Sequence, residues 1–254
     1  MIEKSIANYI TSKKWKDACA AKGLGLPDIP EASTQSDIQQ LANCLTKQDI
    51  VDLLHKKELV IRPLLASDQL GNVGIDFRLG QDFLVSIQGR EPFINASKNY
   101  WLSGGAIRDI FQFFQPTRRQ IGETFILHPH QTVLAVSLEY IKVPDDCILL
   151  LFMRSSYSRL GITISTLAQH GYTGCLSLEL TNNNNNPVNL AIRARIIQGL
   201  FQRVSSSTAY FDSPRKYVCQ VRPEPSAVIK DQDLSVLNHL WEASNNRVPS
   251  SITP

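Results

Sequence analysis

Hydrophobic and polar residues alternate over much of the chain after residue 73, which is the pattern of β-strands. The segment VGIDFRLGQDFLVSI (73–87) switches between apolar and polar residues every one or two positions and is interrupted by glycine. Further short segments share this texture and are separated by Pro, Gly and Asn turns: 123–129, 131–143, 147–153, 161–166, 174–182, 188–192 and 195–204. Many short strands predict a sandwich or a jelly-roll-like barrel rather than a βαβ sheet.

In the N-terminal region, the apolar residues recur with a different period. Apolar residues at three- and four-residue spacing predict helices in 2–15 and 36–45. Thr46 is a predicted N-cap, followed by a helix within 47–59 that has Ile50, Leu53 and Leu54 on one face. We expect an insertion with a short helix in 97–120. The predicted parts are therefore a helical extension (1–44), a β domain (45–231) and a C-terminal tail (232–254).

Composition narrows the class of protein. With 43% hydrophobic and 19% charged residues, the 254-residue chain is expected to fold. A net charge of +3 gives no reason to expect nucleic-acid binding. The five cysteines form no C-x-x-C pair, so we expect neither zinc nor a disulfide framework. The N-terminus lacks the apolar stretch of a signal peptide, and no run is long enough to span a membrane, so we expect a cytoplasmic protein.

A basic, hydroxyl-rich turn follows the strand 147–153. It holds Arg154, Ser155, Ser156 and Arg159 within six residues. Two guanidinium groups and two hydroxyls offer charge-assisted donors that suit phosphate oxygens. On the residues alone, an exposed polar turn with solvated charges is an equally open interpretation.

The strand 174–182 carries one acidic residue. Alternation places Ser177 and Glu179 on one face and three leucines on the other. Glu179 is therefore either a solvent-facing residue of an edge strand or a carboxylate that faces a ligand and acts as a general base.

Several motifs occur in a fixed order in this region. RSSYSRLG (154–161) is followed by GYTG (171–174), by SLE (177–179) and by Asn182. This order resembles that of dCTP deaminases and, more distantly, of trimeric dUTPases. The similarity extends from about Leu45 to Asp231 through segments 45–63, 73–85, 123–146 and 210–231.

The resemblance implies a dUTPase-like, distorted jelly-roll fold and a homotrimer with sites between subunits. It implies deamination of dCTP to dUTP, with Glu179 as general acid and base, without zinc. Ser155 would orient the water. Ser177 and Leu178 would contact the nucleotide. Arg154, Ser156 and Arg159 would bind the triphosphate together with Mg²⁺. Tyr210, Lys216 and Gln220 would close over the nucleotide from the C-terminal segment. Ser155 and Arg159 complete the implied catalytic set.

One loop departs from the family pattern. Residues 164–174 (ISTLAQHGYTG) are shorter than the family loop and contain neither its Asp nor its Pro. Sugar recognition then falls to Gln169 or His170. Three functions stay open: a dCTP deaminase, a dUTP pyrophosphatase or bifunctional enzyme that forms dUMP, and a non-catalytic nucleotide sensor.

Overall fold

The computed structural model describes residues 44–88, 94, 96, 110–207, 210–212, 215–228, 231, 233, 236, 237, 239 and 240. The helices predicted in 2–15 and in most of 36–45 lie outside these residues, as do much of 97–120 and most of the tail. The three-part division of the chain therefore stays a prediction.

The first described residues correct one boundary. Cys44 and Leu45 were expected to end a helix, but they are extended: Cys44 forms a β-bridge with Gln202, and the Leu45 N–H donates to the Phe201 carbonyl at 2.9 Å. Pairing with a strand that is distant in sequence here overrides the local helical pattern.

The predicted helix at Thr46 is confirmed as α4 (Lys47–His55). The Thr46 hydroxyl accepts from the Asp49 N–H at 3.4 Å, and the Asp49 carboxylate accepts from the Thr46 N–H at 2.8 Å. This reciprocal capping box satisfies two amides that a helix N-terminus would otherwise leave unpaired. Ile50 and Leu53 of α4 are buried.

All of the strands predicted from alternation have counterparts, and the strands 60–62, 114–118 and 166–168 are additional. Of the insertion expected in 97–120, the described residues show the single turn η3 (Ile110–Phe113) followed by the strand 114–118, and residues 97–109 lie outside them. The strands are β1 (Val60–Arg62), β2 (Ile75–Ser86), β3 (Phe114–Arg118), β4 (Thr124–Leu127), β5 (Thr132–Lys142), β6 (Cys147–Met153), β7 (Ile162–Thr163), β8 (Thr166–Ala168), β9 (Thr173–Asn182), β10 (Val188–Ala191) and β11 (Arg195–Arg203). Short helical turns are η1 (Ser67–Gln69), α5 (Ser155–Ser158) and η4 (Tyr210–Asp212).

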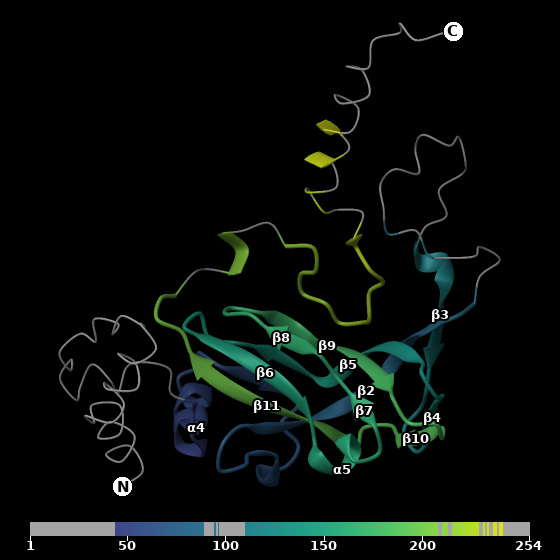
Figure 1. The fold of residues 1–254 in the computed structure, drawn as a ribbon. Helices are drawn as coiled ribbons and strands as arrows, with labels where there is room; N and C mark the ends of the chain where they lie inside the picture. The colour runs from purple at the N-terminus through teal and green to yellow at the C-terminus, as the bar shows by residue number, and fades with distance from the viewer. Residues whose placement is uncertain are drawn as a thin grey trace, which may run out of the picture. The chain divides into compact units, whose positions relative to one another are not determined.

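The strands form one large antiparallel sheet in the order β7-β9-β5-β2-β11-β6-β8, with β1 beside β5 and β3 beside β2. Strands β4 and β10 pair separately. The two terminal strands of this order, β7 and β8, are consecutive in sequence, so the sheet curls until its ends approach each other (Figure 1). The predicted all-β architecture is confirmed.

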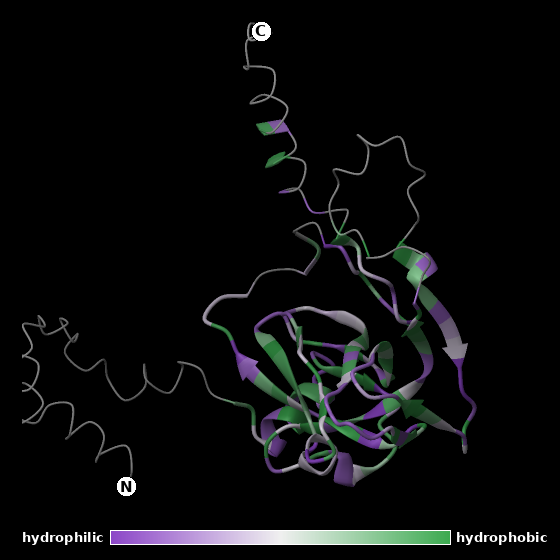
Figure 2. Ribbon diagram, turned by 45° about the vertical axis from the view of Figure 1, so that its right-hand side comes forward, coloured by the Kyte–Doolittle hydropathy of each residue, from purple (hydrophilic) through white to green (hydrophobic). Residues whose placement is uncertain are grey.

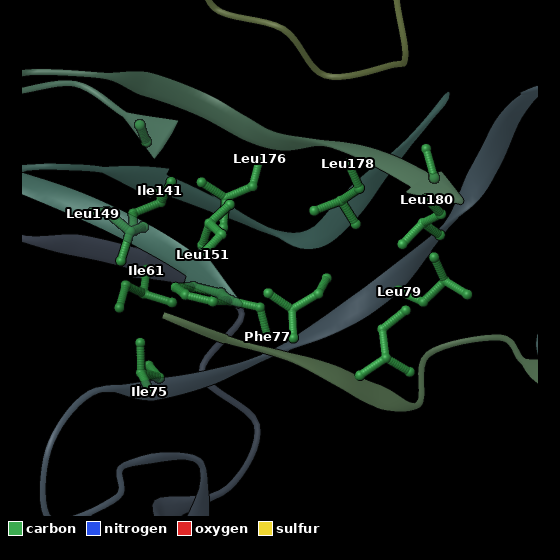
Figure 3. Close-up of a cluster of buried hydrophobic side chains, with 14 of the residues drawn as sticks. Ile61, Ile75, Phe77, Leu79, Ile141, Leu149, Leu151, Leu176, Leu178 and Leu180 are labelled. Atoms are coloured by element: carbon green, nitrogen blue, oxygen red, sulfur yellow. The ribbon is translucent and has the colours of Figure 1, made fainter. Parts of the chain in front are cut away.

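The concave side of the sheet holds the hydrophobic core. Leu176, Leu178 and Leu180 extend from β9 toward the space that Phe77 of β2 also fills, and all four side chains are at most 1% exposed (Figure 3). The apolar residues are concentrated along the strands that surround this space (Figure 2). Burying such large side chains contributes roughly 1.5–3 kcal/mol each to folding.

A bulge in β5 sets the path of β9. Pairing of β5 with β9 shifts between Val136 and Tyr140. At the bulge, the Ser137 hydroxyl donates to the Glu139 carbonyl at 2.7 Å and accepts from the Leu176 N–H at 2.8 Å. The bulge thereby holds the part of β9 that precedes Ser177 and Glu179.

The carboxylate of Glu139 is fully buried beside this bulge. It pairs with the Arg78 guanidinium at 3.2 Å and accepts from the Gln69 amide at 3.1 Å. Burial raises the pKa of Glu139, and the hydrogen bonds and charge of Arg78 oppose that shift. These partners explain how a carboxylate is accommodated in the centre of the sheet.

Candidate active site

The predicted site residues lie mainly in two separate hollows of the chain. The first, of about 650 Å³, is lined by Asp68, Asp76, Arg154, Ser155, Ser156 and Arg159, among others. The second, of about 420 Å³, is lined by Gln169, Ser177, Glu179, Tyr210, Lys216 and Gln220, among others. Both volumes are in the range of small-molecule sites.

Arg154 anchors the basic turn in the first hollow. Its Nε lies 3.3 Å from the Asp76 carboxylate, and its Nη1 donates to the Arg195 carbonyl at 3.1 Å. Desolvation raises the pKa of Asp76, while the charge of Arg154 acts in the opposite direction. Because its Nε and Nη1 are engaged within the chain, Arg154 shapes the turn as well as adding positive charge.

The remaining members of the turn are open to solvent. Ser155, Ser156 and Arg159 are all exposed. Within the described part of the chain, Arg159 has no carboxylate within ion-pairing distance. Its guanidinium is therefore available to an anion that enters the hollow.

Glu179 lies in the second hollow, on a strand that pairs with β5 along most of its length and with β7 only at Thr181 and Asn182. Its carboxylate is half-buried and accepts two hydrogen bonds. The Thr166 hydroxyl of β8 donates to Oε2, and the Ser177 hydroxyl donates to Oε1 at 3.2 Å. The alternation predicted for β9 is confirmed, since the side chains from Thr173 to Asn182 are alternately half-buried and buried.

A C-terminal segment, residues 210–228 without the undescribed positions, lines part of the second hollow. The Gln220 carbonyl accepts from the Cys175 N–H of β9 at 2.6 Å. The Tyr210 hydroxyl donates to the Tyr217 carbonyl at 3.1 Å, and Lys216 pairs with Asp231. This arm brings three predicted residues, Tyr210, Lys216 and Gln220, to the hollow of Glu179.

The two candidate residues of the shortened loop differ in their relation to the second hollow. Gln169 lines the second hollow, where its side-chain oxygen already accepts from Arg215. His170 does not line that hollow, and its Nδ1 is buried without a hydrogen-bond partner in the described structure. Leu178 has no exposed side chain, so a contact between it and a ligand would have to be made by its main chain.

Among the residues of the second hollow that the sequence did not single out are Thr166, Tyr172, Arg215 and Tyr217. Tyr217 and Tyr172 belong to motifs that were noted, so their aromatic character was an available signal. Arg215 stacks on the Tyr210 ring, with its guanidinium carbon 4.8 Å from the ring centre. Thr166 carries no local signal, because its contact with Glu179 depends on the curl of the sheet.

Two properties concern the chain more generally. No helix among the described residues is long and apolar enough to cross a membrane. The same residues contain no group of three or more His, Cys, Asp and Glu side chains that could hold a metal ion. The expectation of a zinc-free site rests on the sequence and stays a prediction.

Comparisons with known proteins bear on this arrangement. Residues 44–204 match the family model described as dCTP deaminase-like. The chain is 32% identical over 197 residues to the "dCTP deaminase, dUMP-forming" of Methanobrevibacter smithii, covering 75% of this chain and 97% of that protein. It is 31% identical over 196 residues to the dCTP deaminase of Halorubrum lacusprofundi, covering 74% and 93%.

A solved structure is also similar. The 2'-deoxycytidine 5'-triphosphate deaminase of Agrobacterium tumefaciens superposes with a TM-score of 0.48 at 21% identity, over 64% of this chain and 49% of that one.

Proposed function

The chain belongs to the dCTP deaminase-like family of enzymes, and from this premise we propose that it hydrolyses the 4-amino group of dCTP with Glu179 as general acid and base. The observation that carries the proposal is the position of Glu179. Its carboxylate is half-buried in a 420 Å³ hollow, held by two hydroxyls and bordered by the C-terminal arm. A positioned carboxylate of this kind suits proton transfer to and from a substrate.

The proposed reaction converts dCTP and water into dUTP and ammonia. Glu179 takes a proton from water while the water oxygen bonds to C4 of the cytosine ring and the electron pair of the C4=N3 bond moves to N3. The protonated Glu179 then gives that proton to the 4-amino nitrogen, the C4–N bond to that nitrogen breaks to release ammonia, and the C4=N3 bond re-forms. The proton of the remaining 4-hydroxyl moves to N3, which gives the 4-keto uracil ring. Ser155 and main-chain groups orient the water and stabilise the tetrahedral intermediate.

The first hollow is the proposed triphosphate site. Ser156 presents an exposed hydroxyl, Arg159 presents a guanidinium that has no ion-pair partner among the described residues, and Arg154 adds a fixed positive charge. Mg²⁺ enters as part of the nucleotide substrate, since the triphosphate oxygens are its natural ligands. Tyr210, Lys216 and Gln220 close the arm over the nucleotide and exclude water.

We further propose a homotrimer whose sites combine the two hollows of neighbouring subunits. The two hollows share no lining residue within one chain. Strand β6 supports the proposal because it is apolar on both faces: Leu149 and Leu151 face the core, while Phe152 on the outer face is 48% exposed. Leu167 of the neighbouring β8 is 49% exposed. An antiparallel strand with one face in water normally has polar residues there.

Mixing two impaired variants tests the shared site, at a dCTP concentration well below the Kd of Arg159→Ala. Glu179→Gln lacks the proposed base, and Arg159→Ala lacks the proposed phosphate ligand. After joint refolding, mixed trimers contain some sites with both native residues, so activity should return to a measurable fraction of that of the unmutated protein. No recovery despite confirmed mixed assembly, or a monomeric mass by light scattering, would contradict the shared site.

The product decides between the two enzymatic alternatives. Several relatives are named as dUMP-forming, including that of Methanobrevibacter smithii, and others as dCTP deaminase. Incubation with dCTP, dUTP, CTP and dCMP plus Mg²⁺, followed by chromatography, separates dUTP from dUMP as product. Binding of dCTP without release of ammonia or pyrophosphate would instead favour a nucleotide sensor. A cytoplasmic location is part of the same proposal.

A further inference from the structure

We propose that Thr166 is a positioning residue for Glu179, holding one carboxylate oxygen so that the other can exchange a proton with water. The inference rests on the proposed function, because it concerns the base of that reaction. Its starting point is the hydrogen bond from the Thr166 hydroxyl to Glu179 Oε2, which joins β8 to β9.

The topology makes this contact unusual. β8 is a three-residue strand whose sheet partner is β6, with Thr166 opposite Leu151. Glu179 lies on β9, opposite Leu134 of β5. Because β5, β2, β11 and β6 lie between β9 and β8 in strand order, the hydroxyl reaches the carboxylate only through the curl of the sheet.

The two hydroxyls around Glu179 have different origins. Ser177 is two residues away on the same face of β9 and donates to Oε1 at 3.2 Å, so it moves with the strand that carries Glu179. Thr166 comes from another strand and fixes the carboxylate relative to the opposite wall of the hollow. An ionised carboxylate has about four acceptor positions, so both bonds leave room for water.

The chemistry of a hydroxyl suits a group that changes protonation during the reaction. A threonine hydroxyl can donate to the ionised carboxylate and can accept from the protonated one. Thr166 can therefore stay bonded to Glu179 through both proton transfers. A methyl group in its place would leave Oε2 without this partner and the carboxylate held by Ser177 alone.

The expected effects separate positioning from mere stabilisation. Thr166→Val keeps the shape and removes the hydroxyl, and kcat should fall roughly 10- to 100-fold, with the KM for dCTP changing less than about threefold. A donated bond favours the ionised form of a carboxylate. Its loss favours protonation, so the acidic limb of the pH–rate profile should move to higher pH. Thr166→Ser keeps the donor and should restore kcat to within about threefold.

A matched control lies on the same face of β9. The Thr181 hydroxyl bonds to that of Thr132 at 2.9 Å and does not line the second hollow. Thr181→Val therefore loses one hydroxyl bond of a similar kind without touching Glu179, and it should leave kcat and the pH profile unchanged. An equal loss of kcat in Thr166→Val and Thr181→Val would reduce Thr166 to a structural residue and overturn the proposal.

A second measurement keeps the inference independent of turnover. In protein labelled with ¹³C at glutamate carboxyl carbons, the resonance assigned by its loss in Glu179→Gln should titrate at higher pH in Thr166→Val than in the unmutated protein. Thr181→Val should not shift it. If the unmutated protein released no ammonia from dCTP, the proposed function would fail while this titration still tested Thr166. An unchanged midpoint in Thr166→Val would refute the positioning role.

Discussion

The two hollows of the β domain differ in how their charged groups are held. In the first, Ser155, Ser156 and Arg159 are exposed, and Arg159 has no ion-pair partner in the described structure. In the second, Glu179 is half-buried and bonded to two hydroxyls, and Gln169 is bonded to Arg215. One hollow presents free donors, and the other presents an oriented acceptor.

This contrast matches what each half of a nucleotide requires. A triphosphate is flexible and highly charged, so exposed forked donors can adapt to it. Proton transfer to a ring atom needs an acceptor fixed within hydrogen-bond reach. The separation of the hollows in one chain is also what a site shared between subunits would show. The following predictions test the contrast, from the largest expected effect to the smallest.

Glu179→Gln should abolish deamination while leaving nucleotide binding intact. Glutamine has the size of glutamate and can accept hydrogen bonds, but it cannot take up a proton at neutral pH. We expect kcat to fall by at least about 10³-fold, because one group serves both proton transfers. Ammonia release and calorimetric dCTP affinity are the paired measurements. Glu123→Gln, at the exposed start of β4, is the control, and near-normal deamination by Glu179→Gln would remove Glu179 from the mechanism.

Arg159→Ala should weaken binding instead of chemistry. Losing a charge-assisted bond to the triphosphate costs roughly 2–4 kcal/mol if the pair is desolvated in the complex, which is about 30- to 1000-fold in Kd. Arg118→Ala is the matched control, since Arg118 is an exposed arginine paired with Asp82 outside both hollows. Titration calorimetry with dCTP and Mg²⁺ measures the difference. Equal affinities of the two variants would show that the basic turn is only a solvated loop.

Gly171→Ala should disturb the rim of the second hollow. Gly171 has a φ of +68°, and an added Cβ would lie 2.7 Å from the Tyr210 Cβ and 2.8 Å from the Asp145 carboxylate. We expect a loss of roughly 2–4 kcal/mol in the free energy of unfolding. Gly122→Ala is the control, because Gly122 has a φ of +87° with open space around it, so only backbone strain of about 1–2 kcal/mol applies.

Urea unfolding of both glycine variants gives the comparison, and the KM for dCTP adds a functional measure. Displacement of Tyr210 should raise KM in Gly171→Ala but not in Gly122→Ala. Equal destabilisation by the two substitutions would mean that the C-terminal arm moves away at Tyr210 without lowering the free energy of unfolding.

Thiol labelling should distinguish the cysteines buried in the sheet from the exposed ones. Burial raises the pKa of Cys175 on β9 to about 11 and that of Cys147 on β6 to about 12. Alkylation proceeds through the thiolate, so both should react at least about tenfold more slowly at pH 8 than the exposed Cys44 and Cys219. Below its pKa, the thiolate fraction of Cys175 rises about tenfold per pH unit. Mass spectrometry of the labelled peptides should show that rise between pH 8 and 10, and a flat profile would contradict it.

The sequence by itself determined the elements and much of the candidate site. Period-two alternation located the strands, and Thr46 with Asp49 marked the start of α4. The same alternation turned Glu179 away from the core, because successive side chains of a strand face opposite sides. The basic turn after β6 was visible as a cluster of donors. These features are local, since each depends on residues within a few positions of one another.

Only the tertiary structure decided which of these local features meet. The strand at 114–118 was not predicted, and it forms because β2 offers a pairing edge to its backbone. Thr166 reaches Glu179 because β8 pairs with β6 and the sheet curls. The basic turn and Glu179 lie in separate hollows because β6, which precedes the turn, is separated from β9 in the sheet by β5, β2 and β11. Strand partners and register arise from contacts between residues that are distant in the chain, and no local period encodes them.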